Sequence, residues 1–191
     1  MHRNRPLNNH GVSHGGVVIL YKETACQLKQ LDIKNPEEFE ILVASGSIRG
    51  HARKLVVFAI YLLPNYKKER ADRALSYITD LVITMKRRFN DPYLVLAGDF
   101  NQWKIDTALD DFVDLKEVEV GETRGSRSID RIFVNNCRAV LECETVDPLE
   151  TEDENPARSD HRVAFVRMDL QRVEAFKWEE YSYRYFNNES V

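Results

Sequence analysis

The chain has 191 residues, a formal net charge of -4, 43% hydrophobic residues and 30% charged residues. This length suits one domain with a sizeable core, and the composition is ordinary for a globular protein. No apolar run approaches the roughly 18 residues that a membrane helix needs, and the polar N-terminus lacks the apolar segment of a secretory signal. We therefore expect no membrane association and an intracellular protein, with the nucleus among its expected locations.

Cysteine and charge distribution narrow the class further. Cys26, Cys137 and Cys143 are odd in number and lack metal-ligand spacing, which predicts reduced thiols rather than a disulfide framework. Residues 1–90 carry 15 Lys and Arg against 8 Asp and Glu, whereas residues 91–191 carry 12 against 23. A basic half beside an acidic half suits a metal-dependent enzyme acting on a polyanion, although solvated surface charge explains the same counts.

The first half of the chain alternates between loops and apolar runs. Residues 1–14 have no periodicity and are predicted as a loose lead-in. β-Branched residues after a glycine pair predict a strand over 15–21, and a weaker strand signal covers 38–48, where Ser-Gly-Ser closes the apolar part 38–44. The apolar run 55–61 is typical of a strand buried on both faces, and it ends at Tyr61 before a Leu-Leu-Pro break.

A helix and a second apolar strand follow. Apolar residues recur every three or four positions from Ala71 to Phe89, which predicts an amphipathic helix. The run 93–97 then predicts another strand buried on both faces, and it leads into Gly98, Asp99 and Asn101. Glycine permits a sharp turn there, so the two polar side chains would project from the carboxyl end of the strand, where α/β proteins collect ligand groups. An ordinary Gly-Asp turn is the simpler alternative.

Polar groups adjoin predicted strands twice more in the second half. Asp130 interrupts an apolar stretch, so it needs either solvent or a partner, and Asp160 and His161 stand directly before the last strand. The predicted elements are a short helix over 104–112, a strand over 116–120, a loop over 121–126, a strand over 128–134, an acidic loop over 147–158 and a strand over 163–168. Strand, helix and strand in this rhythm indicate α/β layering.

These motifs also occur in a familiar order. Gly-Asp-Phe-Asn at 98–101, Ser-Ile-Asp-Arg-Ile-Phe at 128–133 and Ser-Asp-His at 159–161 resemble the endonuclease/exonuclease/phosphatase family, the deoxyribonuclease-I-like metal-dependent phosphodiesterases. The resemblance covers residues 15–170 and is strongest to the endonuclease domain of non-LTR retrotransposon polyproteins. The tail 171–191 is similar to the linker that leads toward reverse transcriptase. The resemblance implies DNA and a reverse transcriptase domain as partners, and Mg²⁺ or Mn²⁺ as cofactor.

The resemblance implies a four-layer α/β/β/α sandwich of two mixed sheets. Family members begin with one strand ending in Asn and a second strand carrying a metal-binding Glu. About fourteen residues precede Gly15 here, and none of them is glutamate. We therefore expect one sheet to lack its N-terminal strands, the chain to be N-terminally truncated, and activity to be impaired.

Site residues carry over by motif. The resemblance makes Asp99 a general acid or base, Asn101 a hydrogen-bond donor to the phosphate oxygens, and Tyr61 a contact of the phosphate. His161 would lie against the phosphate with its other ring nitrogen held by Asp130. Asp160 would help to place the metal ion.

Two further interpretations remain open. A non-catalytic remnant would bind nucleic acid through the basic first half and through Tyr181, Tyr183 and Tyr185, although these tyrosines also suit an ordinary tail. A phosphatase acting on a small phosphoester or lipid head group would use the same catalytic residues, because the sequence gives no pocket shape.

Overall fold

The structure is a computed structural model that describes residues 2–4, 16–34, 36, 39–64, 67–103, 109, 113–147 and 160–170. The strands are β1 (His2–Asn4), β2 (Gly16–Val18), β3 (Cys26–Gln30), β4 (Glu40–Ile48), β5 (Lys54–Tyr61), β6 (Tyr93–Asp99), β7 (Lys116–Val118), β8 (Asp130–Val134), β9 (Val140–Val146) and β10 (Val163–Met168). The helix α1 (Lys68–Arg88) follows β5, and a 3₁₀ turn, η1 (Cys137–Ala139), precedes β9.

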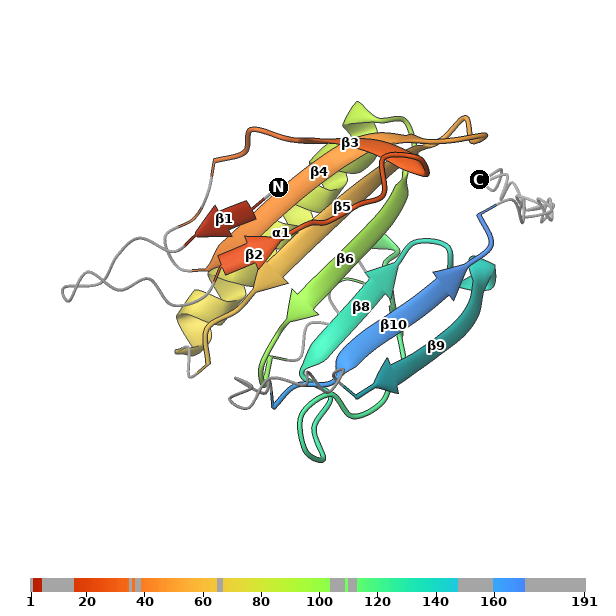
Figure 1. Cartoon of the computed structure of the whole chain (residues 1–191). Helices are drawn as coiled ribbons and strands as arrows, with labels where there is room; N and C mark the ends of the chain where they lie inside the picture. Colours follow the sequence, from red (N-terminus) through yellow and green to blue (C-terminus); the bar gives the residue numbers. More distant parts are fainter. Residues whose placement is uncertain are drawn as a thin grey trace, which may run out of the picture.

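A mixed six-stranded sheet forms the centre of the molecule, with the strand order β3-β4-β5-β6-β8-β7 (Figure 1). β5 and β6 are parallel and are joined through α1, because a parallel pair requires a crossover connection. The other neighbours are antiparallel. In this register Tyr61 is paired with Asp99, and Asp99 with Asp130. Polar residues at the ends of three neighbouring strands therefore meet at one end of the sheet.

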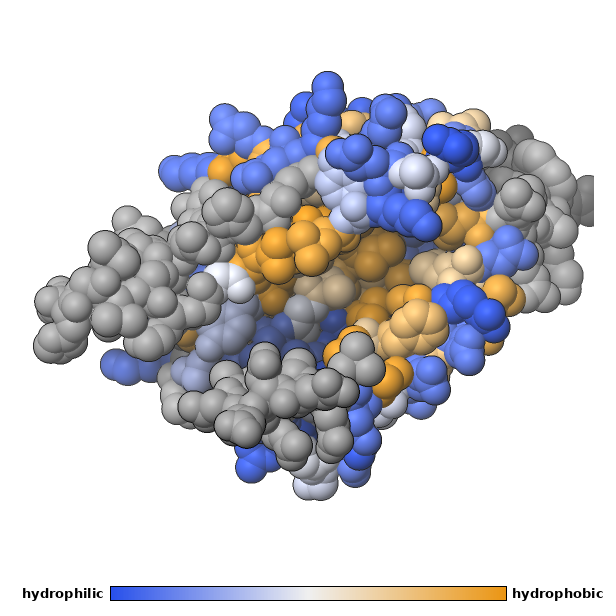
Figure 2. All heavy atoms as spheres, viewed as in Figure 1, coloured by the Kyte–Doolittle hydropathy of each residue, from blue (hydrophilic) through white to orange (hydrophobic). Residues whose placement is uncertain are grey.

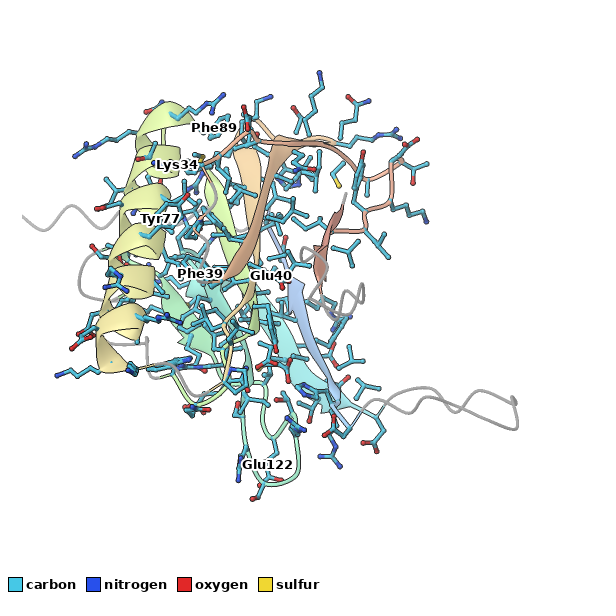
Figure 3. All side chains as sticks on the ribbon, turned by 90° about the vertical axis from the view of Figure 1, so that its left-hand side faces the viewer. Lys34, Phe39, Glu40, Tyr77, Phe89 and Glu122 are labelled. Carbon is cyan, nitrogen blue, oxygen red and sulfur yellow. The ribbon has the colours of Figure 1, made fainter. Side chains whose placement is uncertain are left out.

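Helix α1 covers one face of this sheet (Figure 3). Its apolar stripe packs against the strand residues that point to the same side, such as Val56, Phe58 and Leu96. Tyr77 adds a second attachment, because its ring meets Phe39 edge-on at a centroid distance of 5.8 Å and its hydroxyl donates to the carbonyl of Lys34. The buried helix residues are Ala74, Ile78, Val82 and Met85.

Two small antiparallel sheets lie on the opposite face. The β1–β2 pair packs through Val17 over β3, β4 and β5, and the β9–β10 pair packs through Ala164 and Val166 over β6, β7 and β8 (Figures 1 and 3). This arrangement confirms the α/β class with a large mixed sheet and a smaller second sheet layer. The described residues supply three of the four expected layers, and no outer helical layer lies among them.

The two small sheets leave the centre of that face incompletely covered. Leu55, Val57 and Ala59 on β5 and Val95 and Ala97 on β6 point to this side and are only partly buried. Figure 2 shows the resulting hollow, with its apolar lining, between the small sheets. The prediction that both strands are buried on two faces is therefore wrong on this side, because β2 and β10 do not pair with each other over it.

Several element boundaries differ from prediction. Residues 2–4, predicted within a loose lead-in, form β1 by pairing with β2. β4 runs on through the Ser-Gly-Ser segment that was expected to close its apolar part, because Gly46 allows close contact with β3: a Cβ there would lie 1.7 Å from the carbonyl oxygen of Gln27. Most of the helix expected over 104–112, the acidic loop from 148 and the tail 171–191 lie outside the described residues. In the described part of the chain no helix is long and apolar enough to span a membrane.

Candidate active site

Asp99, Asp130 and His161 converge at the end of the sheet where β6 ends and β8 begins. Asp99 is the last residue of β6 and is paired with Asp130, the first residue of β8. His161 stands just before β10, which packs over this side of the sheet. One ligand atom from each of the three residues lies within 4.8 Å of the others. His161 and Asp130 are 31 residues apart in the sequence, so it is the fold that brings them together.

Gly98 makes this convergence sterically feasible. Its φ is +156°, and a Cβ at this position would lie 1.8 Å from the carbonyl oxygen of Ile60 on β5. No side chain fits between the two strands, so only glycine allows β6 to continue beside β5 to the edge. Asp99 is thereby placed on the same face as its register neighbour Tyr61, which is half-buried.

His161 is oriented by Asp130. Its Nδ1 lies 2.8 Å from Oδ2 of Asp130, and both side chains are about one quarter exposed, at 24% and 23%. A carboxylate in this position fixes the tautomer and the orientation of the ring. The other ring nitrogen, Nε2, lies 3.8 Å from Oδ1 of Asp160.

Asp99 is held by the turn that follows it. The backbone N–H of Asn101 donates to Oδ1 of Asp99 at 2.8 Å, and Asn101 adopts a φ of +49°, a conformation that asparagine tolerates well. Burial raises the pKa of the Asp99 carboxyl above its ordinary value, and the charge of Asp130 raises it further. The Asn101 N–H, His161 and Arg124 oppose this rise. A carboxyl with a raised pKa is suited to proton transfer near neutral pH.

The side chain of Asn101 is partly committed within the fold. Its Nδ2 donates to the carbonyl of Leu62 at 2.6 Å, in the loop that follows β5. An amide carries two N–H donors, so one remains for a substrate oxygen, together with the carbonyl Oδ1.

Asp160 forms an ion pair with Arg124, a residue that the sequence motifs did not reveal. Nε and Nη2 of Arg124 lie 2.6 and 2.5 Å from Oδ2 of Asp160. The hydrogen bond from Arg124 lowers the pKa of the Asp160 carboxyl below its ordinary value, and the charges of Arg124 and His161 add to this effect. Asp160 lies beside the group formed by Asp99, Asp130 and His161 rather than within it. Its expected role in metal binding therefore stays a prediction.

Thr123 is a second residue that motif-based reasoning missed. Its fully buried hydroxyl accepts hydrogen bonds from the backbone N–H groups of Ile129, at 3.1 Å, and Asp130, at 3.0 Å. Its carbonyl accepts the N–H of Arg162 at 2.7 Å. One residue thus links the segment carrying Asp130 to the segment carrying His161. A threonine within a predicted polar loop is the only sequence signal of this role, and it is weak.

The donor set fits a divalent cation. Two carboxylates and an imidazole form the group, and Mg²⁺ typically binds through one or two carboxylates while keeping water and substrate oxygens. Among the residues that the structure describes, no glutamate belongs to this group. Asp99 and Asp130 supply the carboxylate oxygens of this group.

Comparisons with known proteins agree with this geometry. The sequence profile described as the Endonuclease/Exonuclease/phosphatase family matches residues 2–161, and the chain belongs to this family. The family resemblance inferred from the motifs is thereby confirmed. No curated protein matches the chain.

Solved structures show the same DNase I-like fold at low sequence identity. An endonuclease/exonuclease/phosphatase from Bacteroides vulgatus has a TM-score of 0.59 and 16% identity over 88% of this chain and 76% of that one. The human Nocturnin catalytic domain with bound sulfate anion has a TM-score of 0.56 and 13% identity over 88% and 72%. A humanized D. rerio TDP2 has a TM-score of 0.50 and 14% identity over 73% of this chain. The chain spans 66% of the length of that TDP2 chain.

Proposed function

We propose that this chain is a metal-dependent phosphodiesterase of the endonuclease type, with the DNA backbone as substrate. The observation that carries the proposal is the 2.8 Å contact between His161 Nδ1 and Asp130 Oδ2 beside Asp99, in a member of a family of phosphoester hydrolases. The basic first half of the chain supports a polyanionic substrate.

Each residue has a defined task in this proposal. Asp99, whose pKa is raised by burial, exchanges a proton with the attacking water or the leaving oxygen. His161, oriented by Asp130, presents Nε2 to the phosphate and stabilises its growing negative charge. Asn101 donates its remaining amide N–H to a phosphate oxygen, and Tyr61, beside Asp99 in the register, contacts the same group.

A bound Mg²⁺ or Mn²⁺ would supply charge neutralisation at the phosphate and a more acidic water. Asp130 would hold it, and Asp160, ionised beside Arg124, would contribute from the rim, which leaves Asp99 for proton transfer. The choice between the two metals rests on the family resemblance.

A retrotransposon origin, with a reverse transcriptase domain as partner, is the finer form of the proposal. The support for it is the order of the Gly-Asp-Phe-Asn, Ser-Ile-Asp-Arg-Ile-Phe and Ser-Asp-His motifs and the similarity of the tail to an interdomain linker. The hollow between β2 and β10 supports the related expectation that the family domain holds further strands here, one of them bringing a glutamate to the site. Expression of a longer chain with the in-frame upstream sequence, followed by a metal-binding titration, tests that expectation.

Nicking of supercoiled plasmid in the presence of Mg²⁺ tests the proposed activity. We expect relaxation of the plasmid by the wild-type chain, inhibition by EDTA, and loss of nicking in both Asp99→Ala and His161→Ala. Arg138→Ala, an exposed change in η1 that lies outside the basic first half, is the control and should nick normally. Salt-sensitive plasmid binding without cleavage would favour a nucleic-acid-binding remnant, whereas hydrolysis of small phosphomonoesters alone would favour a phosphatase.

A further inference from the structure

A pocket with a volume of about 490 Å³ lies next to the candidate active site. The segment after β6 and the β7–β8 connection form its walls, together with Glu117 on β7 and Arg131 on β8. Glu122, labelled in Figure 3, lies in the second of these segments. Asn101 and Arg124 line the pocket and also contact Asp99 and Asp160, so the pocket and the active site share a boundary. Its volume is within the range of roughly 300–1,000 Å³ that is usual for small-molecule sites.

The charge of the pocket favours an anion. Three arginines line it, of which Arg124 is paired with Asp160 and Arg131 with Glu117. Arg127 is exposed and forms no ion pair with any carboxylate of the described residues. Its backbone is nevertheless fixed, because its N–H and carbonyl are both hydrogen-bonded to Arg124 across the turn. Among the described residues the pocket therefore offers one guanidinium that no carboxylate pairs, on a hydrogen-bonded turn, and a guanidinium binds phosphate oxygens well.

Trp103 gives the pocket an ordered aromatic wall. Its indole N–H donates to the carbonyl of Leu63 at 3.2 Å, and its backbone N–H donates to the carbonyl of Phe100 at 3.1 Å. Its carbonyl accepts Nη1 of Arg131 at 3.0 Å. A ring that is already held in place loses little conformational entropy when a ligand packs against it.

We infer that this pocket binds the nucleotide unit next to the scissile phosphate, with its base on Trp103 and its phosphate on Arg127. An ordered indole combined with a guanidinium that no described carboxylate pairs is the chemistry that recognises a base and its phosphate in single-stranded nucleic acid. A small phosphoester without a base would fill the active site and leave this pocket unused. The inference rests on the proposed function and extends it, because it names single-stranded DNA as the substrate form.

Two substrates distinguish the contribution of the pocket from that of the catalytic centre. A quenched single-stranded oligothymidine can occupy both sites, whereas methyl p-nitrophenyl phosphate can occupy only the catalytic centre. We expect Arg127→Ala to raise the KM for the oligothymidine about tenfold and to reduce the salt dependence of this KM by about one phosphate contact. Hydrolysis of the small diester should be unchanged, and the control Arg138→Ala should leave both substrates unaffected. Equal effects of Arg127→Ala on both substrates, or none on the oligothymidine, would overturn the inference.

Binding measured without turnover tests the inference even if the chain proves inactive. In a Trp178→Phe background Trp103 is the remaining tryptophan, and oligothymidine should quench its fluorescence whereas an abasic oligonucleotide should not. Arg127→Ala should weaken the affinity for oligothymidine, measured by fluorescence anisotropy, by about tenfold. Quenching by both oligonucleotides, by neither, or unchanged affinity in Arg127→Ala would refute base recognition here. Absence of hydrolysis with intact quenching would refute only the proposed activity.

Discussion

At the scale of single residues, the surroundings of Asp99 change the stability of its charged form. Burial raises the pKa of this carboxyl, so its ionised form is less favourable in the folded chain than in the unfolded chain. A raised folded pKa contributes stability at low pH, and this contribution is lost as the pH rises through the folded pKa. The cost of the ionised carboxylate is therefore felt near neutral pH.

Asp99→Asn removes that charge and keeps an oxygen for the Asn101 N–H. We expect the unfolding free energy of the variant to rise relative to that of the wild type as the pH passes from the unfolded to the folded pKa of Asp99, and the difference then to level off. Urea titrations in EDTA at several pH values measure the difference. Asp72→Asn, a change of an exposed carboxylate on α1, is the control and should show no such gain. A gain in unfolding free energy that is independent of pH would contradict the expectation that burial raises the pKa of Asp99.

Thr123 is expected to support the site through its hydroxyl. Thr123→Val removes the acceptor of two backbone N–H groups, so the fold should lose about 1–3 kcal/mol and hydrolysis should fall with it. Thr123→Ser retains the hydroxyl, so it should retain most of the stability and most of the hydrolytic activity. Chemical denaturation and plasmid nicking of the two variants measure this. Equal stability in Val and Ser variants would show that the hydrogen bonds contribute little.

At the scale of elements, β6 depends on one glycine. Gly98→Ala places a methyl group against the carbonyl of Ile60, so we expect a loss of about 3 kcal/mol or more, or failure to fold. Gly50→Ala is the matched control: its φ is also positive, at +80°, but its Cβ would meet nothing within 4 Å. It should cost only the local backbone strain, about 1–2 kcal/mol. Similar losses in the two variants would argue against the close approach of β5 and β6.

The two faces of β5 should respond differently to the same substitution. Val56 is fully buried under α1, whereas Val57 is partly exposed at the hollow. Val56→Thr should lose about 1–3 kcal/mol, because its hydroxyl is buried without an assured partner, and Val57→Thr should lose less than about 1 kcal/mol. Urea unfolding of both variants checks this. A larger loss at Val57 would indicate that the hollow is filled in solution.

Strong apolar patterns made several elements predictable from the sequence. The period of α1 and the runs that became β5 and β6 identified these elements to within a few residues. β3 and β9 were not predicted, because Cys26–Gln30 and Val140–Val146 are rich in polar residues and form strands by pairing with neighbours at an edge. Local sequence carries little information about such edge pairing.

At the scale of the whole molecule, the site forms from segments that only the fold brings together. The order of the motifs predicted the family and the two-sheet arrangement, and the structure places His161 against Asp130. Arg124 and Thr123 could not be predicted, because their partners Asp160 and Arg162 are more than 35 residues away in the chain and no local pattern marks either contact. The hollow could not be predicted either, because apolar strand residues look alike whether or not a second sheet covers them.

The central claim is that Asp130 and His161 act as one unit in phosphodiester hydrolysis. The most direct measurement is a double-mutant cycle on plasmid nicking with Mg²⁺, using Asp130→Ala, His161→Ala and the double variant. Groups that act as a unit give non-additive losses, so we expect the double variant to be little slower than His161→Ala alone. Losses that multiply, or single variants that nick at the wild-type rate, would contradict the claim.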